Sequence, residues 1–467
     1  MQRASSTGLL LLSGIAAVVA CEDGSSSANN PSVQQPDFDA GSQEGGTTNP
    51  PPGTGLVVTV VAAGKPTANV RVLFHDAAGA VIADTKTDAN GKVTAATAPS
   101  QMTLAIAPIG LPDQQRFTLV TYAGIEAGDS LTFDLSMSTD PLPSLGYEVT
   151  LGATVPNTEV YHSIANGSCD VLQGTDELTK ILPISSRCVR PNNSLLVIAR
   201  DTAGLALAFG WQKKIPAPAG PQDPISIGSF AEPTNVGITT TNVPPGTDVA
   251  IVGAAIADGV GYQIYDDDPT TLEMPPSGFA DAIQVSVAAR EQNGPRSLGF
   301  TRRGAHDAAA FDFATALPRF STVTTTIPTP HRPEIAWTTE RSLTGADAVD
   351  GQFFLLRWGV QENPDLIIQR AWYFAVPPGA TSFKAPELPA DLRADYAPPA
   401  DFVAEDFYDE GTAAASLVES TLLPGYKELK ALPFGGWSFD LFLDPTMPLP
   451  AAGVLRVSAI HAALAAD

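Results

Sequence analysis

The stretch that decides the fold is residues 56–97, LVVTVVAAGKPTANVRVLFHDAAGAVIADTKTDANGKVTAAT. From Ala68 to His75 apolar and polar residues alternate, imperfectly only at Leu73, which predicts a half-buried strand. Turn sequences follow at 76–79 (DAAG) and at 88–91 (DANG), and the Asn-Gly pair in the second is a strong hairpin signal. Together with the strand candidates on either side, this pattern predicts a small antiparallel β-sandwich.

The turns also carry a family resemblance. The segment contains G-x-P-x-x-x-V-x-V at Gly64–Val72, D-x-x-G at Asp76–Gly79 and T-D-x-N-G at Thr87–Gly91. This order resembles the carboxypeptidase-regulatory-like domain, a transthyretin-like β-sandwich related to the Cna-B modules of surface adhesins. The motifs specify turns and carry no chemistry. The resemblance therefore implies a fold for residues 55–137 and a non-catalytic role as an appendage or stalk.

Composition extends this expectation to the rest of the chain. A length of 467 residues predicts several domains. The chain has 41 Pro, 40 Gly and only 16% charged residues, which favours short strands joined by turns over long amphipathic helices. The formal net charge of -24 argues against a nucleic-acid partner, which would need clustered Lys and Arg.

The first residues predict export and a lipid anchor. Residues 8–20 are apolar and uncharged, but too short for a membrane-spanning helix, which needs ~20 residues. They match the core of a signal peptide. Val18-Val19-Ala20-Cys21 resembles the bacterial lipobox, which implies cleavage after residue 20 and a lipid on Cys21. Residues 21–54, rich in Ser, Gly, Asn, Pro and acids, are expected to be a disordered tether. We therefore expect attachment to the cell envelope, at the outer membrane.

The middle of the chain contains a weak internal repeat. LLVIARDTAGLALAF at 195–209 aligns with VSVAAREQNGPRSLGF at 285–300, with Arg200 on Arg290 and Gly204 on Gly294. Recurrence at about 90 residues is what tandem immunoglobulin- or fibronectin-like sandwiches would give, although two β-hairpins can be similar by chance.

We therefore expect an all-β chain of tandem antiparallel β-sandwiches, transthyretin-like first and immunoglobulin/fibronectin-like afterwards. Modules are expected at 138–228 and 229–324, with a C-terminal β-rich domain at 325–467. In that last domain, a short helix is expected within Ala404–Leu422, and the segment Gly453–Ile460 reads as a closing strand.

The cysteines predict one disulfide. With Cys21 assigned to the lipid, Cys169 and Cys188 remain as a pair that an exported protein can keep oxidised. Two free buried thiols are the alternative. A metal site is less favoured, because no CxxC or His-rich spacing accompanies them.

Other candidate sites are weak. Asp266, Asp267 and Asp268 could bind calcium, and so could the acidic run within 401–410, although solvated loops explain both and neither has the EF-hand order. The five histidines are far apart, so the sequence predicts no metal site and no cofactor. Strand-like contexts make core packing the default for the tryptophans, including Trp437.

These features predict a non-enzymatic, lipid-anchored envelope protein. Its partners would be the membrane, through the lipid, and a glycan or protein ligand, with the β modules used for adhesion, binding or spacing. Two alternatives stay open: an envelope hydrolase with its site in the C-terminal third, and an accessory subunit of a secretion or uptake complex.

Overall fold

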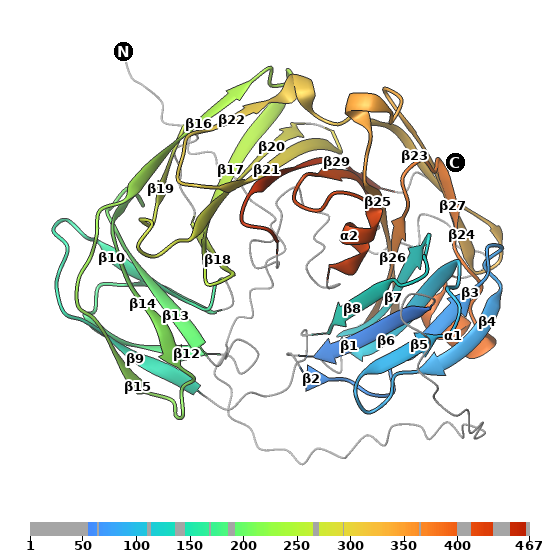
Figure 1. The fold of residues 1–467 in the computed structure, drawn as a ribbon, viewed down its shortest axis with the longest axis horizontal. Helices are drawn as coiled ribbons and strands as arrows, with labels where there is room; N and C mark the ends of the chain where they lie inside the picture. The colour runs from blue at the N-terminus through green and yellow to red at the C-terminus, as the bar shows by residue number, and fades with distance from the viewer. Residues whose placement is uncertain are drawn as a thin grey trace. The chain divides into compact units, whose positions relative to one another are not determined.

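The computed structural model describes residues 55–62, 65–109, 114–135, 145–167, 170–184, 192–264, 270–292, 294–363, 366–398, 412–432 and 449–463. All belong to one compact unit, Asn49–Asp467. The chain is all-β, as predicted, and the described part is built of tandem β-sandwiches (Figure 1). Neither described α-helix has the length and apolarity that crossing a membrane requires.

The first module is a two-layer sandwich. One sheet has β1 in its middle, paired antiparallel with β2 and β5 and parallel with β8, and the other has the order β7-β6-β3-β4. Its strands are β1 (Leu56–Ala62), β2 (Lys65–Pro66), β3 (Arg71–His75), β4 (Val81–Lys86), β5 (Lys92–Ala95), β6 (Gln101–Ile109), β7 (Gln114–Ala123) and β8 (Ser130–Asp134). The parallel pairing of β1 with β8 closes the sandwich, and the sequence did not predict it.

The Asn-Gly turn is present, but it is not a hairpin turn. The Asp88 side chain accepts hydrogen bonds from the backbone of Asn90 and Lys92, both at 2.8 Å. Gly91 has φ +68°, and a Cβ there would lie 2.3 Å from the Val60 carbonyl, so only glycine fits. The strands on either side, β4 and β5, belong to different sheets. The hairpin prediction was wrong because the turn residues determine only that the chain reverses direction. They do not determine which strand pairs with the strand that follows the turn.

The second and third modules have one strand order. Each has a three-stranded sheet whose central strand pairs parallel with the module's last strand, facing a four-stranded antiparallel sheet. The sheets are β12-β9-β15 with β11-β10-β13-β14, and β19-β16-β22 with β18-β17-β20-β21. This equivalence agrees with the repeat read from residues 195–209 and 285–300. Apart from the two-residue β2, the first module has the same order too.

The strands of the second module are β9 (Leu145–Leu151), β10 (Val160–Ala165), β11 (Asp170–Thr175), β12 (Thr179–Ile184), β13 (Asn192–Arg200), β14 (Ala206–Pro216) and β15 (Asp223–Ile227). Those of the third are β16 (Thr234–Thr241), β17 (Thr247–Ala257), β18 (Val260–Ile264), β19 (Thr271–Met274), β20 (Ala282–Glu291), β21 (Arg296–Gly304) and β22 (Ala309–Asp312), followed by the 3₁₀ turn Phe313–Thr315.

The fourth module varies the same plan. Its sheets are β23-β24-β27 and β26-β25-β28-β29, and β23 precedes the central strand β24 and pairs with it antiparallel. Its elements are β23 (Phe320–Thr329), β24 (Arg332–Thr339), a 3₁₀ turn (Gly345–Asp347), β25 (Gly351–Asn363), β26 (Leu366–Val376), β27 (Ser382–Lys384), α1 (Ala390–Tyr396), β28 (Thr412–Ser420), α2 (Tyr426–Ala431) and β29 (Gly453–Ala463). The closing strand read at 453–460 is confirmed as β29.

The helix expected within Ala404–Leu422 is wrong where the structure describes it, since residues 412–420 form β28. The segment TAAASLVES has helix-favouring alanines, but β28 lies between β25 and β29, and residues 414–418 are all buried. Tertiary packing on both sides of the strand overrides local propensity here.

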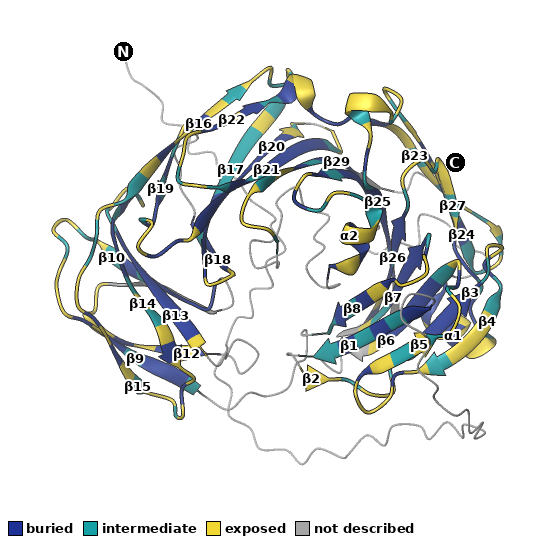
Figure 2. Ribbon diagram, viewed as in Figure 1, coloured by how far each residue is buried: buried dark blue, intermediate teal, exposed yellow. Residues whose placement is uncertain are grey.

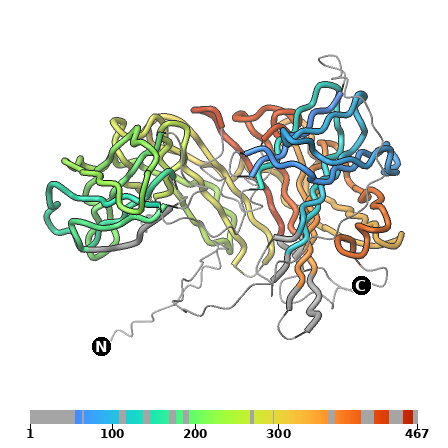
Figure 3. Tube along the Cα trace, turned by 90° about the horizontal axis from the view of Figure 1, so that it is seen from below, coloured from blue at the N-terminus to red at the C-terminus, as the bar shows by residue number. Residues whose placement is uncertain are grey.

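Edge strands join three of the modules into one 12-stranded sheet. The last strand of the third module's sheet, β21, pairs antiparallel with β29 of the fourth, and β26 of the fourth pairs parallel with β7 of the first. Figure 3 shows the blue first module against the orange and red fourth module. The first and fourth modules, which are far apart in sequence, are therefore joined by backbone hydrogen bonds between strands.

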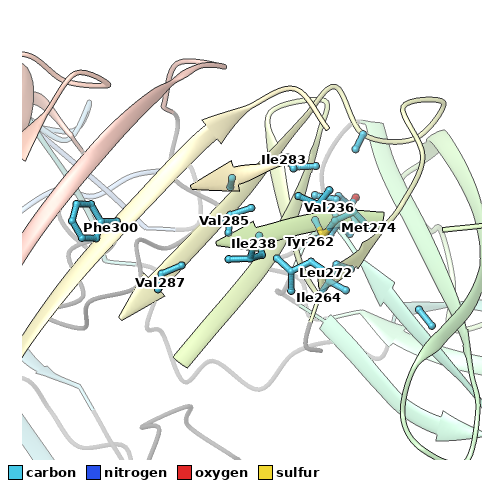
Figure 4. Close-up of a cluster of buried hydrophobic side chains, with 14 of the residues drawn as sticks. Val236, Ile238, Tyr262, Ile264, Leu272, Met274, Ile283, Val285, Val287 and Phe300 are labelled. Carbon is cyan, nitrogen blue, oxygen red and sulfur yellow. The ribbon is translucent and has the colours of Figure 1, made fainter. Parts of the chain in front are cut away.

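Apolar side chains fill each sandwich. In the third module, Val236 and Ile238 of β16 and Leu272 and Met274 of β19 meet β18, β20 and β21 (Figure 4). Burying one such side chain contributes roughly 1.5–3 kcal/mol. The second module's β13 is buried along most of its length (Figure 2). Leu195 and Val197 pack in its own core, and Leu196 and Ile198 pack with the third module's cluster.

Candidate functional site

The sequence-predicted site residues lie outside the described residues. These are Cys21 for the lipid, Cys169 and Cys188 for the disulfide, and Asp266, Asp267 and Asp268 for calcium. The acidic run at 401–410 and Trp437 are also outside them. Among the residues that are described, no group of three or more His, Cys, Asp or Glu side chains is placed to hold a metal ion.

The three tryptophans that the structure describes in the fourth module are core residues. Trp337, Trp358 and Trp372 are 3%, 4% and 0% exposed. Their strand contexts predicted this, and it is confirmed. They do not form a surface platform for a ligand.

A row of buried polar side chains lies at the junction of the first and fourth modules. His75, Thr103, Thr121 and Trp372 stand on the four adjacent strands β3, β6, β7 and β26, and all are fully buried. The Trp372 indole N–H donates to Thr121 Oγ1 at 2.8 Å. The Thr121 and Thr103 hydroxyls are 2.9 Å apart, and Thr103 Oγ1 is 3.1 Å from His75 Nε2. This hydrogen-bonded row crosses the β7–β26 seam.

His75 is held in its neutral form by this environment. Burial, followed by the nearby positive charge of Arg332, lowers the pKa of His75 to about 4. The imidazole therefore has no charge at neutral pH. A neutral ring suits a buried row of hydroxyls, because a desolvated imidazolium would be costly there.

A buried ion pair fastens the same junction from the opposite side of the first module. Lys430 of α2 lies 2.5 Å from Asp129, which precedes β8, and both side chains are 2% exposed. Lys430 Nζ also donates to the Gly124 carbonyl at 2.9 Å and lies 4.9 Å from the Tyr426 ring centroid. The Tyr426 hydroxyl donates to the Ala123 carbonyl at 2.8 Å, and burial raises the pKa of Tyr426 well above its usual value. Helix α2 is thus an inter-module clamp.

Two arginines add contacts nearer the surface. Arg332 of β24 donates to the Ala78 carbonyl in the first module at 3.0 Å and to Glu387 at 3.0 Å. Arg71 of β3 binds Asp84 in its own module and Asp391 of α1. The hydrogen bonds that the Arg71 guanidinium donates to these two carboxylates raise the pKa of Arg71 further above its ordinary value.

The second module contains an unusual buried lysine. Lys180 of β12 is 4% exposed, and its amine donates to the Tyr161 carbonyl at 2.8 Å. Burial lowers the pKa of Lys180 to about 8. The register places Lys180 opposite Val149, on the inward row where the matching strands of the other modules have Val93, Leu272 and Phe383. Sequence reasoning missed this residue, because TKILPI gives no sign of which face is inward.

Comparisons with known proteins are distant. No known protein family matches the chain, and no curated protein does. Among solved structures, it is similar to the Bacillus anthracis TIE protein, with 9% identity over 56% of this chain and 50% of that one and a TM-score of 0.14. It is also similar to the FN1-FN3 domains of chicken CNTN1, with 11% identity over 56% of this chain and 85% of that one and a TM-score of 0.13. Likenesses this weak carry no argument about function.

Proposed function

We propose that the protein is a lipid-anchored cell-envelope protein that presents its fused β modules as a binding platform and catalyses no reaction. The anchor part of the proposal rests on the lipobox-like ending at Cys21 and on the tether-like composition of residues 21–54. Its partners are the membrane, through the lipid, and a protein or glycan ligand outside it. The outer membrane is the proposed location.

The observation that carries the platform role is the junction between the first and fourth modules. A spacer gains reach when each module touches only its neighbours in sequence. Here β7 and β26 pair over nine residues, from Ile367↔Gln114 to Ala375↔Tyr122, and the buried Lys430–Asp129 pair fastens the same junction. Such a body resists extension and keeps its surfaces in fixed relation, which favours binding over spacing.

The negative net charge of the chain argues against polyanionic ligands. With 50 acidic and 26 basic residues, the chain repels polyanions, so nucleic acid is not a proposed partner. The same repulsion keeps copies of the protein apart from one another.

Cell fractionation with the full-length chain tests the anchor. Cys21→Ser should abolish incorporation of labelled fatty acid and move the protein to the soluble fraction. Cys188→Ser is the matched control and should stay labelled and membrane-bound. If the Cys21→Ser protein remains in the membrane, the lipid anchor is wrong. The soluble full-length Cys21→Ser protein then serves as the probe on arrays of glycans and envelope proteins, and selective binding supports the platform role.

A further inference from the structure

The strand β12 has an open edge with an unusual composition. Among the described residues, β12 pairs with β9 alone, and its burial alternates so that Thr179, Ile181 and Pro183 point away from the core. Ile181 is 48% exposed, and Leu178, just before the strand, is 41% exposed. These are two of the four exposed large hydrophobic residues in the part of the chain that the structure describes.

The other modules provide an internal comparison. The position that matches Ile181 is Thr94 on β5 of the first module and Glu273 on β19 of the third. In the fourth module, the outward residues of β27 are Ser382 and Lys384, on either side of the inward residue. Ile181 is the apolar exception. Exposed apolar side chains on an edge strand invite unwanted pairing, and proteins ordinarily replace them with charges. Their presence on β12 indicates that something covers this edge.

The backbone of β12 is available for such a cover. The Leu151 N–H donates to the Leu178 carbonyl at 2.7 Å, which makes Leu178 a residue bonded to β9. By antiparallel alternation, Lys180 and Leu182 are also bonded to β9, and the backbone groups of the outward residues face the open edge. The edge thus offers N–H groups from Thr179 and Ile181. Pro183 has no N–H and sets the end of the pairing.

The acidic residues around this edge indicate what kind of strand it would bind. Asp176 and Glu177 are exposed just before Leu178, and Glu148 lies opposite Ile181 on β9. A second copy of this chain would bring the same acids to the edge and be repelled. A strand with apolar and basic side chains is complementary.

We propose that the β12 edge binds an extended segment of a partner protein by strand addition. In the bound state, an apolar side chain of the partner lies beside Ile181 and a basic one lies beside Asp176 and Glu177. Backbone hydrogen bonds supply affinity and the alternate side chains supply selectivity, as in other strand-addition complexes. The inference rests on the proposed function, because it names the ligand class of the platform.

Binding of model peptides to the full-length Cys21→Ser protein tests this. The probe is an eight-residue peptide alternating valine and lysine. Its comparisons are a valine–glutamate peptide of the same length and a valine–lysine peptide N-methylated at alternate residues. Ile181→Thr should weaken binding of the probe about tenfold. The matched control Ile82→Thr changes an isoleucine that is 58% exposed on β4, at the end of the 12-stranded sheet, and should leave binding unchanged. The double variant Asp176→Asn, Glu177→Gln alters only exposed groups, so it should fold normally and lose the preference for lysine.

Amide hydrogen exchange then locates the contact. The probe should slow exchange at Thr179 and Ile181, which face the edge, and leave Lys180 and Leu182 unchanged because β9 already protects them. The proposal is overturned if no probe binds, if the valine–glutamate or N-methylated peptide binds as well as the probe, or if both isoleucine variants lose binding equally. Concentration-dependent self-association that Ile181→Thr abolishes would assign the edge to a second copy instead. None of these outcomes changes the Cys21 fractionation result, so failure here is distinct from failure of the envelope anchor.

Discussion

Replacing Lys430 with methionine should loosen the junction between the first and fourth modules. The substitution removes the ammonium that lies 2.5 Å from Asp129 and leaves that carboxylate 2% exposed, with the Glu126 N–H still donating to it at 2.8 Å. Removing one partner of a buried ion pair costs about 3–5 kcal/mol, because the remaining charge stays desolvated. We therefore expect the free energy of unfolding to fall by that amount.

A surface pair in the same module provides the control. Arg341 and Asp347 form two hydrogen bonds of 2.9 Å, but the Arg341 side chain is 50% exposed. Such pairs contribute ~0–1 kcal/mol, so Arg341→Met should have little effect. The double variant Lys430→Met, Asp129→Asn should recover at least ~1 kcal/mol relative to the sum of the single changes, because the orphaned charge is gone.

Urea unfolding followed by tryptophan fluorescence measures these differences, since Trp337, Trp358 and Trp372 are all buried in the fourth module. The reasoning is refuted if Lys430→Met costs no more than Arg341→Met, or if the double variant equals the sum of its two single changes. Either result would mean that the buried pair does not fasten the junction.

Three further predictions concern titration and redox state. The folded-state pKa of His75 is about 4, below its ordinary 6.5, so the unfolded chain binds more protons between these pH values. The free energy of unfolding should therefore fall by up to ~3 kcal/mol as the pH drops from 6.5 towards 4. His75→Gln should flatten this pH dependence in urea titrations, and an unchanged slope contradicts the assignment. Lys180 has a folded pKa of about 8 against 10.5, so the second module should gain stability as pH rises from 8 to 10.5, and Lys180→Met should remove that gain in thermal melts. Equal pH dependence in the two proteins would rule it out. If Cys169 and Cys188 form the expected disulfide, the intact mass should rise by two hydrogens on reduction, and free thiols found by alkylation without reductant would disprove the bridge.

The features of the fold that could be predicted were those formed by residues close together in the sequence. Local patterns identified strands and turns correctly, such as the turn at Asp88–Gly91 and the strand at 453–460, because they depend on a few adjacent residues. The repeat between Arg200 and Arg290 anticipated two modules of one design. The β7–β26 and β21–β29 pairings left no local trace, since any well-formed edge strand looks alike in sequence.

The polar junction was equally hard to foresee. Lys430 stands in the short helix α2, which was not expected from the sequence, and Asp129 is one of 50 acidic residues. Their pairing depends on two segments separated by 301 residues. Lys180 was missed for a different reason, because a one-residue change of register would have placed it in solvent and Ile181 in the core.

The β7–β26 seam also sets the order in which the protein can mature. Trp372 and Thr121 are 251 residues apart, so Leu73 and Leu119 on the outer sheet face of the first module stay uncovered until the fourth module has been made. Contacts of such long range form late, and the surface waiting for them is prone to aggregate. We therefore expect this chain to acquire its final form only after its last third has been made.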